Sequence, residues 1–161
     1  MGMMTDRDDV EIRPARTEDA AAISECVTAA YKTYIARLGK PPRPMLDDYK
    51  DVIQQHRVFA LTEATRIIGI LVLVIQRQTL LVDNVAVDPD HQGRGYGRKL
   101  MALAEEEARR LGFTAITLYT NERMTENIEL YNKLGYRELG RKTEQGYDRV
   151  YMQKSLLEEP S

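Results

Sequence analysis

The residues best suited to chemistry form a glycine-containing loop between Asp88 and Arg98. A short apolar run ends at Asp88-Pro89, and Gln92-Gly93-Arg94-Gly95-Tyr96-Gly97-Arg98 then leads into an amphipathic stretch. At the start of a helix the first backbone N–H groups have no partner within the helix, and the helix dipole favours an anion. Glycine allows the backbone to approach that anion closely. The segment therefore predicts a phosphate-binding loop, and an ordinary tight turn into a helix is the alternative.

The glycine spacing argues against two other phosphate loops. A Walker loop ends in Gly-Lys-Ser/Thr, whereas this loop continues as Gly97-Arg98-Lys99. The dinucleotide fingerprint G-x-G-x-x-G follows the first strand of a parallel unit. Here Leu100 stands at the position of the third glycine, and the preceding strands look antiparallel. Neither pattern matches.

The run Gln92 to Gly97 resembles the Gln/Arg-x-x-Gly-x-Gly/Ala loop of the GNAT superfamily of N-acetyltransferases, and Asn84 to Pro89 resembles the strand before it. The resemblance implies that the amides of residues 93–98 bind the pyrophosphate of coenzyme A. It also implies that main-chain groups of Val85 and Val87 pair with the pantetheine arm, as an open strand edge permits. The expected contacts of the cosubstrate acetyl-CoA are Val85, Ala86, Val87, Gln92, Gly93, Arg94, Gly95, Tyr96, Gly97, Arg98 and Asn127.

A second segment resembles the other signature of this family, a helix with a tyrosine that ends at Leu-Gly-Phe/Tyr. Tyr131 precedes Leu134-Gly135-Tyr136, and Asn127 lies four residues before it on the same helix face. The resemblance implies that Tyr131 is the general acid that protonates the departing thiolate. Core packing of its ring is the alternative. An asparagine seven residues before the tyrosine is common in the family but absent here, so Asn121 and Asn127 both stay candidates for the coenzyme contact.

The attacking amine must lose a proton, and two carboxylates are candidates to take it. Asp83 and Glu122 flank the ends of the two strands that, in the family, splay apart around the thioester, and either can act directly or through water. We expect Asp83 to lie in a solvated turn and His91 to be a solvated loop residue.

Two segments are expected to flank the acceptor, because the family places its acceptor site there. They are residues 34–45, with three cationic residues and three prolines, and the loop at residues 141–148. The first is suited to an acceptor with a carboxylate, or is simply a rigid surface connection.

These residues must be positioned by strands and helices that the hydrophobic pattern predicts. Thr17 is the expected N-cap of a helix that ends near Gly39, and a second helix covers Met45 to Gln55. Short runs rich in β-branched residues predict three antiparallel strands between residues 58 and 87. The helix after the loop is expected to carry the pairs Glu105 with Arg109 and Glu106 with Arg110. The last elements are predicted as strands over Ala115–Tyr119, Tyr136–Leu139 and Arg149–Gln153, with a helix over Thr125–Lys133.

Together these elements predict an α/β fold of the GNAT type, with a mixed, mostly antiparallel sheet flanked by helices. The chain of 161 residues suits one domain over residues 1–161, with residues 1–9 expected to be mobile. A net charge of −2 disfavours a nucleic-acid partner. The apolar runs are too short for a membrane helix. Cys26 is the single cysteine, so we expect the cytoplasm.

The sequence thus predicts an acetyl-CoA-dependent N-acetyltransferase without a metal, acting on an amine of a small molecule or peptide by direct attack in a ternary complex. A binding module that senses acetyl-CoA without turnover is the alternative. A monomer and a homodimer are both compatible with the sequence.

Overall fold

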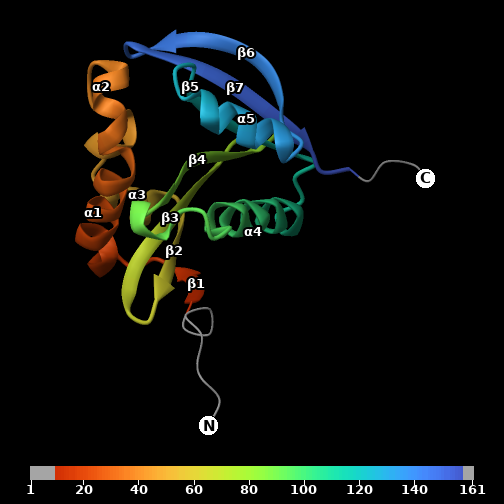
Figure 1. Cartoon of the computed structure of the whole chain (residues 1–161). Helices are drawn as coiled ribbons and strands as arrows, with labels where there is room; N and C mark the ends of the chain where they lie inside the picture. Colours follow the sequence, from red (N-terminus) through yellow and green to blue (C-terminus); the bar gives the residue numbers. More distant parts are fainter. Residues whose placement is uncertain (1–9, 158–161) are drawn as a thin grey trace. The chain divides into compact units, whose positions relative to one another are not determined.

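The computed structural model describes residues 10–157, which divide into two compact units (Figure 1). Unit 1 holds residues 10–73 and 84–102, and unit 2 holds residues 74–83 and 103–157. Strands β3 (Arg66–Ile75) and β4 (Leu80–Val87) and helix α4 (Tyr96–Arg110) each contribute to both units. The expected mobility of residues 1–9 lies outside the described residues, and the single domain over residues 1–161 stays a prediction.

Unit 1 contains an antiparallel arrangement of β1 (Val10–Pro14), β2 (Arg57–Glu63) and β3, with the end of β4 next in order. The pairing of β2 with β3 passes from Leu61 opposite Gly69 to Thr62 opposite Ile67, so Ile68 is the extra residue of a bulge. Gly69 stands at this bulge because there is no room for a side chain. A Cβ there would lie 3.1 Å from Leu61 Cδ2 and 3.2 Å from the carbonyl oxygen of Ala86.

Three helices belong to unit 1, namely α1 (Ala20–Tyr31), α2 (Ile35–Leu38) and α3 (Tyr49–Gln55). Helices α1 and α3 bury apolar side chains together with β2, β3 and the end of β4. The buried cluster comprises Ile23, Cys26, Val27, Ala30, Tyr49, Val58, Ala60, Ile67, Ile70, Val72 and Ala86. The apolar spacing of the first helix and the β-branched runs therefore meet in one core, as binary patterning requires.

Unit 2 is built on β5 (Ala115–Asn121), β6 (Arg137–Glu144) and β7 (Tyr147–Ser155), with helix α5 (Thr125–Lys133) between β5 and β6. Strand β5 pairs in parallel with β4 over Leu80–Val82 and antiparallel with β7, and β7 pairs antiparallel with β6. The sheet is therefore mixed and mostly antiparallel, and the predicted α/β class is confirmed.

Several local predictions were wrong at the ends of elements. Thr17 does not cap the first helix: residues Thr17–Asp19 form a 3₁₀ turn, and the Asp19 carboxylate accepts hydrogen bonds from Arg13 and from the backbone of Arg16. This carboxylate is held in its charged form, because the Arg13 hydrogen bond lowers the pKa of Asp19. The long first helix breaks at a 3₁₀ turn over Lys32–Tyr34 before it ends at Gly39, with φ of +77°.

Further along the chain, the predicted second helix splits into a 3₁₀ turn at Arg43–Leu46 and α3, which Asp48 caps. In α4 the expected partner of Arg110 is Glu106, but Glu107 takes its place at 2.8 Å. The last two strands are longer than predicted. They form a hairpin whose turn is Gln145-Gly146, both with positive φ, so the expected acceptor loop at residues 141–148 is mostly strand. Among residues 10–157 no helix is long and apolar enough to span a membrane.

The tight packing at Gly69 predicts a specific loss of stability. Gly69→Ala should lower the free energy of unfolding by about 1–3 kcal/mol, because the methyl group must displace a backbone oxygen as well as a leucine. Gly140→Ala on β6 is the control, since a Cβ added there would meet no atom of the described residues within 4 Å. Urea unfolding of both variants measures the effect. Equal stability of the two would contradict a close approach at Gly69.

Candidate active site

The end of β4 has a defined open edge in unit 1. The Asp88 N–H donates to the carbonyl of Ile68 at 2.7 Å, which directs the main-chain groups of Asp88 toward β3. Successive residues of a strand direct these groups to alternate edges, so Ala86 also faces β3, whereas Val85 and Val87 face the other edge. The pairing of β4 with β5 covers only Leu80–Val82 and does not include them.

Side chains cover part of this edge. The Tyr31 hydroxyl donates to the Val85 carbonyl at 3.1 Å and to Asn84 Oδ1 at 2.9 Å. The Gln92 side-chain amide donates to the Val87 carbonyl at 3.0 Å. A carbonyl oxygen has two lone pairs, so these bonds leave capacity for a further donor. Of the three predicted strand contacts, Val85 and Val87 carry the outward main-chain groups, while Ala86 packs in the core.

The glycine loop leads directly into the N-terminus of α4. Gly93 and Gly95 have φ of +83° and +82°, a conformation that favours glycine. The Lys99 N–H donates to the Gly95 carbonyl at 3.0 Å, which is the first helical hydrogen bond. The amides of Tyr96, Gly97 and Arg98 therefore precede the first internal donor of the helix, which is the arrangement that binds anions. Tyr96 is buried and anchors the turn, whereas the side chains of Arg94 and Arg98 are exposed.

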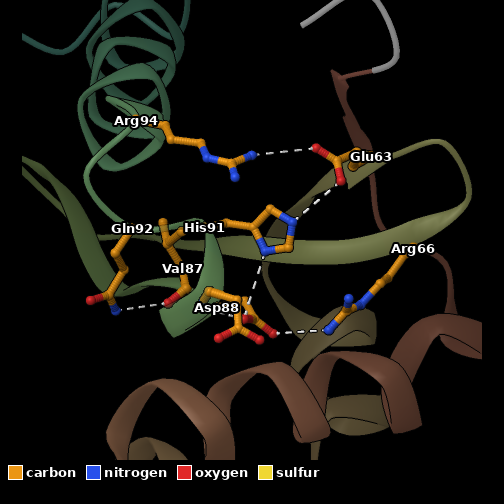
Figure 2. Close-up of polar contacts among 8 residues, drawn as sticks. Glu63, Arg66, Val87, Asp88, His91, Gln92 and Arg94 are labelled. Carbon is orange, nitrogen blue, oxygen red and sulfur yellow. Dashed lines mark hydrogen bonds and ion pairs between the residues drawn. The ribbon is translucent and has the colours of Figure 1, made fainter. Parts of the chain in front are cut away.

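His91 is buried, and its ring lies between the carboxylates of Glu63 and Asp88 (Figure 2). His91 Nε2 lies 3.3 Å from Glu63 Oε1, and His91 Nδ1 lies 3.7 Å from Asp88 Oδ1. The other carboxylate oxygens face cations, with Asp88 Oδ2 3.3 Å from Arg66 and Glu63 Oε2 3.9 Å from Arg94. The prediction of a solvated His91 was wrong, because both carboxylates enclose its ring.

Cys26 lies in the buried apolar cluster of unit 1. Burial raises the pKa of the Cys26 thiol to about 12, and the negative charge of Asp88 acts in the same direction. The thiol is therefore a protonated core group at neutral pH and does not serve as a nucleophile.

Unit 2 contains the predicted acid, Tyr131, on α5. Its side chain is buried, and its ring lies edge-on to Tyr136 with centroids 6.0 Å apart. Tyr136 is the more deeply buried of the two, and its hydroxyl has no hydrogen-bond partner among the described residues. Burial raises the pKa of Tyr136, with the charge of Glu105 adding to the effect. Tyr136 is thus a core residue. Tyr131 is slightly more exposed and packs against the Tyr136 ring from helix α5.

Asn121 and Asn127, the two candidates for a contact with the coenzyme, both form hydrogen bonds with residues close to them in the sequence. The Asn127 side-chain amide points at the Met124 sulfur, 3.6 Å away, and the Asn121 carboxamide oxygen accepts the N–H of Arg123 at 2.9 Å. A thioether is a weak acceptor, so Asn127 is held less firmly than Asn121.

The two candidate bases differ in their surroundings. Asp83 was expected in a solvated turn, but it lies within β4, half-buried, and accepts a hydrogen bond of 2.6 Å from the Tyr119 hydroxyl. Glu122 follows β5 and pairs with Arg141 at 3.6 Å. The partner of Asp83 is 36 residues away, and no local pattern of the sequence indicates it.

Comparison with known proteins identifies the family. The family model described as Acetyltransferase (GNAT) family matches residues 23–136. The chain belongs to the GNAT family. It is 29% identical over 101 residues to the uncharacterized N-acetyltransferase YvbK of Bacillus subtilis (strain 168), a match that covers 62% of this chain and 63% of that protein. The chain therefore matches less than two thirds of the length of this relative.

Solved structures of GNAT proteins share the fold. PaiA N-acetyltransferase from Thermoplasma acidophilum in complex with coenzyme A has a TM-score of 0.75 at 18% identity, over 91% of this chain and 98% of that one. YncA from Salmonella typhimurium with its cofactor acetyl-CoA has a TM-score of 0.68 at 25% identity, over 94% and 96% of the chains. The family and the fold expected from the sequence are confirmed. Among the described residues, no group of three or more His, Cys, Asp or Glu side chains is placed to hold a metal ion.

The GNAT loop predicts which glycine the cofactor needs. Gly95→Ala should weaken acetyl-CoA binding by about tenfold or more, because the methyl group obstructs close approach of the pyrophosphate. Gly112→Ala is matched to it in strain, since both positions have positive φ and a Cβ added at either would meet no described atom within 4 Å. Gly97→Ala adds a methyl group without positive φ, and the family pattern accepts alanine there.

Calorimetry measures the affinity of each of the three variants for acetyl-CoA, and thermal unfolding measures how much stability each substitution costs. Gly95→Ala and Gly112→Ala should lose similar stability, and only Gly95→Ala should lose affinity. An affinity loss shared by Gly112→Ala, or absent from Gly95→Ala, contradicts this placement of the pyrophosphate.

Proposed function

We propose that the protein transfers an acetyl group from acetyl-CoA to an amine of a small molecule or peptide, by direct attack within a ternary complex. The observation that carries the proposal is the junction of β4, the glycine loop and α4. There an open strand edge runs into amides that suit a pyrophosphate, in a chain of the GNAT family.

In this proposal the cofactor follows the order of the chain. The amides of residues 93–98 hold the pyrophosphate, and Arg94 and Arg98 add positive charge to the exposed side of the loop. Main-chain groups of Val85 and Val87 pair with the amides of the pantetheine arm, as in the addition of a strand. Gln92 closes the loop onto Val87, and Asn127 or Asn121 is a further contact from α5 or the end of β5.

Tyr131 is assigned the role of general acid. When the amine attacks the thioester carbonyl, the C–S bond breaks and the thiolate needs a proton, which the phenol supplies. Such assistance accelerates a reaction by about 10²- to 10⁴-fold. The buried Cys26 thiol supports direct attack rather than an acyl-cysteine route, because its pKa is raised to about 12.

The acceptor is proposed to bind near the segment before α3, where cations are already engaged. Arg37 stacks on the Tyr34 ring at 5.0 Å, and Arg43 pairs with Asp47 at 2.6 Å. Arg43 is thus committed within the segment, which weakens the case for a carboxylate-bearing acceptor. A cytoplasmic location is part of the proposal and rests on the single cysteine.

The cofactor assignment predicts selective stabilisation by coenzyme A. Acetyl-CoA at 100 times its Kd should stabilise the folded protein by about 2.7 kcal/mol, seen as a rise in Tm. NAD and ATP at equal concentration should have much smaller effects. The catalytic assignment predicts acetylated products, detected by mass spectrometry, with a panel of amino-acid amides, polyamines and lysine peptides. Binding without any product or hydrolysis would favour an acetyl-CoA sensor, and stabilisation by NAD alone would contradict the cofactor.

The role of the acid predicts different effects for two neighbouring tyrosines. Tyr131→Phe should lower kcat by about 100-fold or more at unchanged acetyl-CoA affinity, because it removes an interaction made in the transition state. Tyr136→Phe is the control. It should keep kcat and be neutral or stabilising, because the lost hydroxyl is buried without a partner among the described residues.

Both variants are assayed with the best panel amine at saturating acetyl-CoA, with chemistry shown to be rate-limiting. Normal turnover in Tyr131→Phe would show that Tyr131 is not the general acid and that its ring only packs in the core. A loss confined to Tyr136→Phe would transfer the role to that residue.

A further inference from the structure

Asp83 and Tyr119 form a close polar pair at the point where two strands of unit 2 cease to pair. The last registered pair of β4 and β5 is Val82 opposite Leu118, and Asp83 and Tyr119 are the next residues on the two strands. The Tyr119 hydroxyl donates to Asp83 Oδ1 at 2.6 Å. Both residues are half-buried, at the point where the pairing of the two strands ends.

A second group of side chains fixes the Tyr119 ring. The Arg149 guanidinium lies 4.3 Å from its centroid, and only 11% of the Arg149 side chain is exposed. Glu144 faces Arg149 at 3.6 Å and accepts the Tyr151 hydroxyl at 2.5 Å. The Tyr151 ring lies 5.7 Å from that of Tyr119, with Lys142 above it. The carboxylate of Asp83 is thus held by a phenol that has little freedom to move.

The core does not require this arrangement. The opposite face of the same strands supplies the apolar packing, through the buried side chains of Leu118, Val150 and Met152. Placing a carboxylate, a phenol and a guanidinium on a half-buried face costs desolvation free energy, and apolar packing does not require it. Glu122, the other candidate, follows the end of β5 and already pairs with Arg141.

We propose that Asp83 is the general base of the acetyl transfer and that Tyr119 is the residue that positions it. This proposal rests on the function proposed above. The Tyr119 hydroxyl donates to one carboxylate oxygen, and an ionised carboxylate has about four acceptor sites on its two oxygens. Asp83 takes a proton from the acceptor ammonium, and the neutral amine then forms the C–N bond while the C–S bond breaks.

The protons balance in this scheme. Of the two protons that the nitrogen loses, one passes to Asp83 and then to solvent. The other replaces the proton that Tyr131 gives to the sulfur. No metal or redox partner is needed, and the products are the N-acetyl amine and coenzyme A.

The test compares three substitutions with the best panel amine. Asp83→Asn keeps an acceptor for Tyr119 but removes the base, so kcat should fall by about 100-fold or more and the acidic limb of the kcat/KM profile should disappear. Asp83→Glu should retain the limb and part of the rate. Glu122→Gln is the matched control and should stay within about threefold of the wild type.

Tyr119→Phe separates positioning from catalysis. It should lower kcat by about tenfold yet retain the acidic limb, since the carboxylate is still present. Acetyl-CoA affinity, measured by calorimetry, should be unchanged in all variants that fold. Full activity with an intact limb in Asp83→Asn, or a loss confined to Glu122→Gln, overturns the proposal. Failure of the wild type to acetylate any amine would instead contradict the proposed function.

Discussion

The hydrogen bond from the Asp88 N–H to the Ile68 carbonyl decides which edge of β4 a ligand can reach. Ile68 is the extra residue of the β3 bulge, and its neighbour Gly69 allows the carbonyl of Ala86 to come close. Because main-chain direction alternates along a strand, fixing Asp88 and Ala86 toward β3 turns Val85 and Val87 the other way. The hydrogen bonding of β3 to the end of β4 therefore leaves the main-chain groups of Val85 and Val87 on the edge of β4 that faces away from β3.

The polar side chains of His91, Glu63 and Asp88 hold the glycine loop in place. His91 is enclosed by Glu63 and Asp88, so the loop is tied to β2 and to the end of β4 through a buried side chain (Figure 2). Arg94 lies 3.9 Å from Glu63 and 47% of its side chain is exposed. An exposed ion pair contributes at most about 1 kcal/mol. The ion pair with Glu63 therefore holds the Arg94 side chain only weakly.

The sequence predicted the elements that depend on local pattern. The β-branched runs located β2, β3 and β4, and the helix over Thr125–Lys133 was predicted with the bounds that the structure has. The family motifs located the loop and Tyr131, because short contiguous segments carry both. Helix starts were less predictable: Thr17 has the chemistry of a cap, but residues Thr17–Asp19 form a 3₁₀ turn and the α-helix begins only at Ala20.

Side-chain environments set by distant residues could not be predicted in this way. His91 is buried because Glu63, 28 residues earlier, reaches it, and Asp83 is held because Tyr119 lies beside it after folding. The Tyr31, Asn84 and Tyr49 chain is similar, with Asn84 donating to the Tyr49 hydroxyl across 35 residues. Spacing along the sequence carries no information about such contacts, which form only when strands, helices and loops pack together.

Met124 shows how a departure from the family pattern is compensated. It occupies the position seven residues before Tyr131 where the family commonly has asparagine, and it is the N-cap of α5 with no side-chain hydrogen bond to the helix. Asparagine is a strong N-cap and its loss typically costs about 1 kcal/mol. Here the methionine side chain is buried instead, and its sulfur faces the Thr120 hydroxyl at 3.8 Å and the Asn127 amide at 3.6 Å. Met124 thus contributes apolar packing but no cap hydrogen bond, and because a thioether is a weak acceptor, it holds the Asn127 amide only weakly.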